Sequence, residues 1–165
     1  MTDDLTLHAH LVGRQGSRAD LNTPVLVLDA DAMERNIAAM AGLVAAHGVA
    51  LRPHAKTHKS VEIARRQIAA GAVGVCCAKI GEAEVLAAGG IEGILVTSPV
   101  AAPRAIERLA ALAGAAKGLM AVVDHPAVAA RLDAALAAPL EVIIDIDPGI
   151  ARTGVASPEA AVALD

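Results

Sequence analysis

Phenylalanine, tyrosine and tryptophan are all missing from this sequence. Proteins that bind single-stranded nucleic acid stack the bases on such rings, so their absence argues against that class of partner. A basic excess is missing too, because the formal net charge is −4 and no cationic surface is left over for a phosphate backbone. We therefore expect no nucleic-acid partner, and a small molecule as the ligand.

Long apolar runs are equally absent. No segment offers the roughly 18 uncharged apolar residues of a membrane span, so we expect no membrane partner. Residues 1–22 contain early acids and no apolar stretch typical of a signal peptide, and we interpret them as a flexible segment of a cytoplasmic protein. The two cysteines, Cys76 and Cys77, are adjacent, which suits neither a zinc site nor a disulfide framework. They are predicted to be small residues of a buried strand.

What is present is a globular composition with a repeating pattern. Hydrophobic residues make up 55% of the chain and charged residues 19%. Short apolar runs typical of buried strands occur at 24–29, 51–57, 74–80, 93–99, 119–125 and 141–147. Alanine-rich stretches with helical periodicity separate them, so the pattern is strand, helix, strand, helix.

Two of these stretches have apolar residues at clear helical spacing. Met33, Ile37, Met40 and Val44 recur at spacings of four, three and four, and Gly48 supplies a stop. The second stretch begins with a proline suited to a first helical turn. This proline is Pro103. The apolar face of the stretch consists of Ile106, Leu109 and Leu112.

Apolar strands joined by helices favour a parallel sheet with right-handed crossovers, either doubly wound or closed as a (β/α)8 barrel. The glycine-rich "GGIEG" at 89–93 precedes a strand, the wrong side for a dinucleotide-binding turn, so the barrel is preferred. We predict an α/β fold in which residues 23–165 form an incomplete TIM-type barrel of five or six βα units. A full barrel needs eight strands and about 250 residues. The sequence ends within a predicted helix that begins at Ser157 and Pro158, as expected for the N-terminal part of a larger protein.

The stretch "LRPHAKTHKS", residues 51–60, concentrates basic chemistry in an apolar chain. Read as a strand, it places Arg52, His54, Lys56 and His58 on one face, and we expect that face to line the barrel interior. Burial and neighbouring positive charge both favour the neutral amine of a lysine, the form that attacks a carbonyl and holds it as a Schiff base. From the spacing alone, a solvated basic face or a lysine paired with a carboxylate is the favoured interpretation.

The two histidines of this stretch raise the question of a metal. In a strand, His54 and His58 lie about 13 Å apart, too far to share one ion. We therefore name no metal ligand among the residues of this chain.

The stretch "EVIIDIDPGIARTGV", residues 141–155, is the second informative one. Asp145 and Asp147 share one strand face, and Arg152 follows in the loop beyond the strand end, where a barrel builds its active-site mouth. Arg152 is a permanent cation that can donate to an anionic oxygen. A salt bridge to Asp147 is the alternative. The carboxylate pair could suggest glycoside hydrolysis, but no aromatic platform for a sugar exists.

These stretches together carry a family resemblance. "TPVLVLDADAMERNI", "LRPHAKTHKSVEIARRQIAAGAVGVCCAKIGEAEVL", "ILVTSPV" and "DIDPGIARTGV" resemble the N-terminal portion of the D-threonine aldolase and D-serine dehydratase group. Members of that group are pyridoxal-phosphate enzymes with an alanine-racemase-type barrel. The resemblance implies that Lys56 is the Schiff-base lysine and that Arg152 contacts the cofactor's phenolic oxygen. It also implies that His54 and His58 line the site.

The resemblance further implies a lyase acting on D-3-hydroxy amino acids through the Lys56 Schiff base. The aldolase type, which converts D-threonine to glycine and an aldehyde, is the leading hypothesis. A D-serine dehydratase, an amino-acid racemase and a non-catalytic pyridoxal-phosphate carrier are the alternatives. The residues alone do not specify which D-amino acid is the substrate.

Other family features lie beyond these 165 residues. Relatives are about twice as long, and their later strands and phosphate-binding loops have no counterpart here. Their C-terminal β domain carries the divalent-metal site, so the metal that the family implies has its ligands outside this chain. Members generally build the site at a dimer interface, which predicts a homodimer for the full-length form. We expect the 165-residue chain alone to lack full activity.

Overall fold

The computed structural model describes residues 7–164, and the chain divides into two compact units, 1–35 and 36–165. The first unit contains two short 3-10 helices, η1 (Ala9–Leu11) and η2 (Ser17–Asp20). Residues 1–6 of the predicted flexible segment lie outside the described residues. Flexibility of the remainder of that segment stays a prediction.

The strand predicted at 24–29 is wrong. Residues 25–29 have no regular secondary structure, and the apolar side chains of Val25 to Leu28 are exposed. A strand exists only when its backbone groups pair with a neighbouring strand, and the first unit contains no strand among its described residues.

Helix α2 (Ala30–Ala46) confirms the helix predicted around Met33 to Val44. The Asp29 carboxylate accepts the Ala32 N–H at 2.8 Å, which satisfies one of the free donors of the first turn. After the last turn, Gly48 has a φ of 64°, a left-handed conformation that glycine adopts without strain. The Val49 N–H then donates back to the Val44 carbonyl at 3.0 Å and closes the helix.

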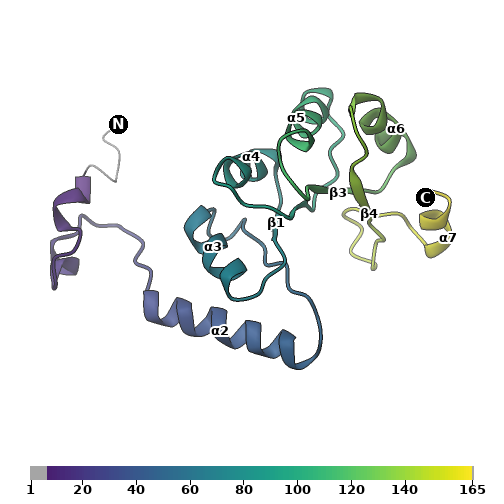
Figure 1. Cartoon of the computed structure of the whole chain (residues 1–165). Helices are drawn as coiled ribbons and strands as arrows, with labels where there is room; N and C mark the ends of the chain where they lie inside the picture. The colour runs from purple at the N-terminus through teal and green to yellow at the C-terminus, as the bar shows by residue number, and fades with distance from the viewer. Residues whose placement is uncertain (1–6, 165) are drawn as a thin grey trace. The chain divides into compact units, whose positions relative to one another are not determined.

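The second unit alternates helices and strands along the chain (Figure 1). Its remaining elements are α3 (Val61–Ala69), β1 (Val75–Cys77), α4 (Ile80–Ala88), β2 (Ile94–Val96), α5 (Pro103–Ala113), β3 (Met120–Val123), α6 (Pro126–Ala135), β4 (Glu141–Ile144) and α7 (Pro158–Val162). Helix α7 begins as predicted, with the Ser157 hydroxyl accepting the Ala160 N–H at 3.2 Å and Pro158 in the first turn.

The four strands form one parallel sheet in the order β1-β2-β3-β4. Each strand lies beside the next one in sequence, with no reversal of order, which is the arrangement of a barrel and not of a doubly wound sheet. Residues before α3 extend the sheet past β1 through a parallel bridge between His54 and Cys76. The Ala55 N–H donates to the Cys76 carbonyl, and the Cys76 N–H donates to the Pro53 carbonyl, both at 2.8 Å. The chain therefore contributes five strand–helix units to an α/β sheet, as the sequence predicts.

The hydrophobic core lies between the sheet and its helices, and Figure 1 shows α4, α5 and α6 side by side along the strands. From the helices, Leu86, Ile106 and Leu109 are buried, and the α5 residues among them are those predicted from the helical spacing. Cys77 is fully buried while Cys76 is half-buried, so both lie in a core strand as expected. Burial first, then nearby negative charge, raises the pKa of Cys77 to about 12, so this thiol stays protonated and unreactive.

Within residues 7–164, none of the helices is both long and apolar enough to cross a bilayer.

Candidate functional site

The candidate site lies where the parallel strands end. His54 ends the segment beside β1, Thr97 directly follows β2, and Asp124 directly follows β3. Because these strands run parallel, their carboxyl ends share one edge of the sheet, the edge at which barrel enzymes build active sites.

Lys56 lies in a turn at this edge, not in a strand. The Ala55 carbonyl accepts the N–H groups of His58, at 3.2 Å, and of Lys59, at 2.7 Å, so the chain reverses directly after Ala55. Lys59 has a φ of 50°, a left-handed conformation that closes the turn. The predicted alternation therefore holds for half-buried His54 and buried Ala55, and it is wrong for Lys56 and His58.

The amine of Lys56 is exposed, in contrast to the partly desolvated lysine expected from the sequence. The difference follows from the turn, which carries the side chain beyond the end of the sheet. Within the described part of the chain, this amine makes no side-chain hydrogen bond or ion pair, so it is available to a ligand.

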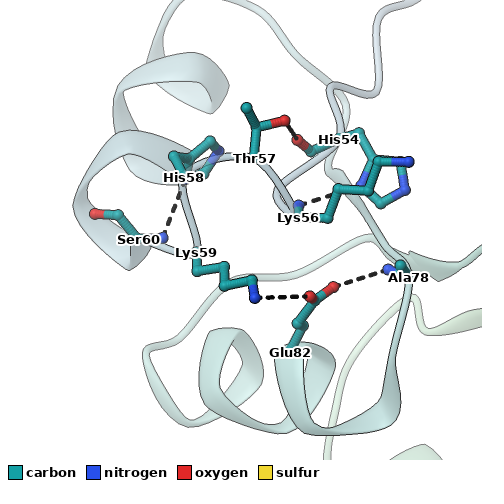
Figure 2. Close-up of polar contacts among 8 residues, drawn as sticks. All are labelled: His54, Lys56, Thr57, His58, Lys59, Ser60, Ala78 and Glu82. Atoms are coloured by element: carbon teal, nitrogen blue, oxygen red, sulfur yellow. Dashed lines mark hydrogen bonds and ion pairs between the residues drawn. The ribbon is translucent and has the colours of Figure 1, made fainter.

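His54 is held on both ring nitrogens. Its Nδ1 accepts the backbone N–H of Lys56 at 3.2 Å (Figure 2), and its Nε2 lies 3.3 Å from Thr97 Oγ1. Burial, followed by the positive charge of Lys56, lowers the pKa of His54 below its ordinary value, and the opposing effects of Glu82 and of the Cys76 backbone are smaller. At neutral pH the ring is therefore an uncharged imidazole beside the lysine.

Glu82 is a structural residue of the site that sequence reasoning missed. One of its carboxylate oxygens accepts the Ala78 N–H at 2.9 Å, and the other lies 3.8 Å from Lys59 Nζ, as Figure 2 shows. It thereby joins the turn that carries Lys56 to the start of α4. An acidic residue in the first turn of a predicted helix was the available signal, because such residues cap free N–H groups.

His58 lies on the opposite side of the turn from Lys56. Its Nδ1 accepts the Ser60 N–H at 3.1 Å, while its Nε2 is buried without a hydrogen-bond partner among the described residues. Burial lowers the pKa of His58, against weaker opposition from Gln67 and the Ser60 backbone. This ring is therefore neutral at pH 7 and belongs to the packing under the turn.

The loop that carries Arg152 is organised by two carboxylates. Asp147 accepts the N–H groups of Gly149, Ile150 and Ala151 at 2.8–3.1 Å, and Asp124 accepts that of Gly154 at 3.1 Å. A carboxylate that accepts several amides is a strong, charge-assisted anchor. Asp147 thus fixes the backbone of the loop that carries Arg152.

Arg152 is exposed and, within residues 7–164, has no ion pair with Asp147 or any other carboxylate. The structure brings His54 and Lys56 into contact, whereas Arg152 shares their edge of the sheet without touching either. Its assignment as a cofactor contact therefore stays a prediction.

The residues present fit pyridoxal phosphate in their chemistry. An aldehyde needs an accessible primary amine, which Lys56 provides, and an anionic oxygen needs a cationic donor, which Arg152 provides. Residues 7–164 contain no group of three or more histidine, cysteine, aspartate or glutamate side chains arranged to hold a metal.

Fold and edge chemistry together define a parallel α/β sheet of barrel type with an accessible lysine at its carboxyl edge. Residues 28–165 match the family described as "Alanine racemase, N-terminal domain". The chain belongs to this family, and the matched range contains all the described strands.

Three relatives place the chain more closely. It is 42% identical over 150 residues to a 3-hydroxy-D-aspartate aldolase of Paracoccus denitrificans, covering 88% of this chain and 39% of that protein. It is 39% identical over 144 residues to a D-threo-3-hydroxyaspartate dehydratase of Delftia sp., a match that covers 86% of this chain and 38% of that protein. The crystal structure of D-threonine aldolase from Filomicrobium marinum superimposes with a TM-score of 0.84 at 43% identity, and the match covers 89% of this chain and 40% of that structure. The chain therefore spans about two fifths of the length of the relatives it matches.

Proposed function

We propose that the protein carrying this chain is a pyridoxal-phosphate-dependent lyase of D-3-hydroxy amino acids, of the D-threonine aldolase type. The observation that carries this proposal is the amine of Lys56, which is exposed and unpaired in the described residues while Lys59 beside it is paired with Glu82. An amine that attacks an aldehyde has to be accessible and free of a carboxylate, and Lys56 meets both conditions.

Each site residue has a proposed task. Lys56 holds the cofactor aldehyde as a Schiff base, Arg152 donates to a cofactor oxygen from its anchored loop, and His54 lines the site beside the lysine. When bound, pyridoxal phosphate supplies the electron sink for the reaction. The protein's own task is to orient the substrate so that one chosen bond at Cα is broken. A homodimeric full-length form is part of the proposal, because the family that the chain resembles generally builds its site at a dimer interface.

A dehydratase is the second candidate, because the Delftia relative carries that name at 39% identity. One substrate separates the two reactions. With D-threonine, an aldolase releases glycine and acetaldehyde, whereas a dehydratase releases 2-oxobutanoate and ammonia. A racemase would instead invert Cα alone and produce L-allo-threonine, and a non-catalytic carrier would leave D-threonine unchanged.

The experiment that tests cofactor attachment is an absorbance titration of the purified chain with pyridoxal phosphate, followed by borohydride reduction and peptide mapping. We expect a visible band in the wild type that is absent from Lys56→Ala, with the reduced cofactor recovered on Lys56. Lys117→Ala is the matched control, because Lys117 is exposed but precedes β3, at the opposite edge of the sheet.

Two results would overturn the assignment. A band of equal intensity in Lys56→Ala would place the cofactor on another amine. A full-length protein without any band at saturating pyridoxal phosphate would remove the cofactor from the proposal altogether.

A further inference from the structure

Thr97 connects two strand ends at the candidate site. It directly follows β2, and both its N–H, at 2.8 Å, and its hydroxyl, at 3.0 Å, donate to the carbonyl of Cys77 at the end of β1. Since the hydroxyl proton points to that carbonyl, the free lone pairs of Oγ1 are left for another donor. The ring of His54 lies against them, with Nε2 at 3.3 Å.

The hydrogen bonds of the two ring nitrogens determine the tautomer of His54. Nδ1 accepts the Lys56 N–H and so cannot itself carry a proton. A neutral ring then carries its proton on Nε2, which donates to Thr97 Oγ1. The result is a directed chain from the Lys56 N–H through the imidazole and the Thr97 hydroxyl to the Cys77 carbonyl.

We propose that Thr97 and His54 are positioning residues for Lys56. Thr97 fixes the orientation of the imidazole, and the imidazole fixes the backbone of the reactive lysine at the start of its turn. Lys56 is otherwise exposed, and the turn is anchored at its far end by Lys59 and Glu82. Without the His54 contact, the residue that carries the amine would be held on one side only.

The arrangement makes the position of Lys56 dependent on pH. A protonated His54 carries a proton on Nδ1 as well, and two N–H groups then face each other between His54 and Lys56. The charged groups that act on the ring are Lys56 in the same turn and Glu82 on α4, and the backbone of Cys76 on β1 also acts on it. Glu82 is the one negative charge among them, and Lys59 already pairs with it.

This inference deepens the proposed function and rests on it for the role of Lys56, but its test needs no cofactor. In the ligand-free 165-residue chain, long-range 15N–1H NMR reports the tautomer of His54, and hydrogen exchange reports the protection of the Lys56 amide. We expect the Nε2–H tautomer in the wild type. We also expect Lys56 protection to fall when His54 becomes protonated.

Three variants test the chain of contacts. Thr97→Val removes the hydroxyl at nearly constant shape, and we expect the Lys56 amide to exchange about fivefold faster, the effect of losing one hydrogen bond. Thr97→Ser restores the hydroxyl and should restore protection. His54→Asn keeps an acceptor near the Nδ1 position without a titrating ring, so protection should persist and lose its pH dependence.

A Nδ1–H tautomer in the wild type would overturn the proposal, and so would Lys56 protection that is identical in Thr97→Val and the wild type. These outcomes are distinct from a failure of the proposed function. A missing cofactor band with the expected NMR result would leave the positioning chain in place and remove only the Schiff-base role of Lys56.

Discussion

Individual carboxylates at the candidate site act on the backbone more than on cations. Glu82 accepts the Ala78 N–H, Asp124 accepts that of Gly154, and Asp147 accepts three successive amides. Each of these bonds satisfies a main-chain donor at a strand end, where regular pairing stops. The acidic side chains therefore hold the loops, and the basic side chains Lys56 and Arg152 are left exposed for a ligand.

Glu82→Ala is expected to destabilise the chain by about 1–3 kcal/mol, because it leaves the Ala78 N–H without its partner. Glu82 is only 13% exposed, so water replaces the lost carboxylate poorly. Glu62→Ala is the matched control, since Glu62 is 61% exposed and forms an ion pair with Arg66 one helical turn away. Loss of the Glu62 side chain should lower the free energy of unfolding by less than about 1 kcal/mol. Urea unfolding of both variants measures the difference, and equal losses would contradict the role assigned to Glu82.

The two histidines of the turn predict the pH dependence of stability. The pKa values of His54 and His58 in the folded chain both lie below the ordinary 6.5. At a pH between the folded-state pKa and 6.5, the unfolded chain therefore binds more protons than the folded one. The free energy of unfolding therefore rises with pH in that window. This contribution is complete above about pH 6.5 and is lost as the pH falls toward the folded-state pKa values.

Urea midpoints measured from pH 5 to 8 test this sign. We expect a loss of stability on acidification that becomes smaller in His54→Gln and in His58→Gln. The control is His47→Gln, since His47 is exposed and directly follows the last residue of α2. A slope that is unchanged in both turn variants would show that other groups cause the pH dependence.

At the scale of elements, the sequence predicts helices better than turns. The α5 residues Ile106, Leu109 and Leu112 are buried as their spacing indicates, because one helical face is specified locally. The turn at Lys56 was missed because alternating side chains in "HAKTHK" continue the pattern of the strand. The turn is fixed by contacts with Glu82 and Thr97, which are distant in sequence, and no local pattern contains them.

The loop after β4 offers a prediction at the element scale. Asp147→Ala removes the acceptor of three backbone amides, and we expect hydrogen exchange at Gly149 to Ala151 to accelerate at least tenfold relative to the wild type, since each lost bond is worth about 1 kcal/mol. Ala151 has a φ of 55°, a strained conformation for alanine that the carboxylate helps to maintain.

Asp133→Ala is the control for this variant, because Asp133 is exposed on α6 and its side chain accepts no backbone amide among the described residues. If the Arg152 loop serves the cofactor, Asp147→Ala should also weaken pyridoxal-phosphate binding in the full-length protein. Unchanged exchange at all three amides would show that the loop is held by its bridge between Ile146 and Val155 alone.

At the scale of the whole molecule, the sheet of the second unit ends at β4 without a further paired strand among the described residues. The segment that contains His54 covers the outer edge of β1, whereas β4 pairs only with β3 among the described residues. Exposed apolar side chains accompany that edge, since Val142 is 45% and Ile143 42% exposed. An unpaired edge with apolar side chains is a template for another strand.

We therefore expect the 165-residue chain to self-associate through β4 at micromolar concentrations. Ile143→Lys places a charge on this strand, which natural edge strands use to prevent pairing, and it should shift the chain toward the monomer. Val85→Lys is the matched control, because Val85 is 58% exposed on α4, away from the edge. Light scattering coupled to size-exclusion chromatography measures the mass of each variant. A wild-type chain that stays monomeric at all concentrations would contradict the expectation, and an equal shift in Val85→Lys would attribute association to general surface hydrophobicity instead of the β4 edge.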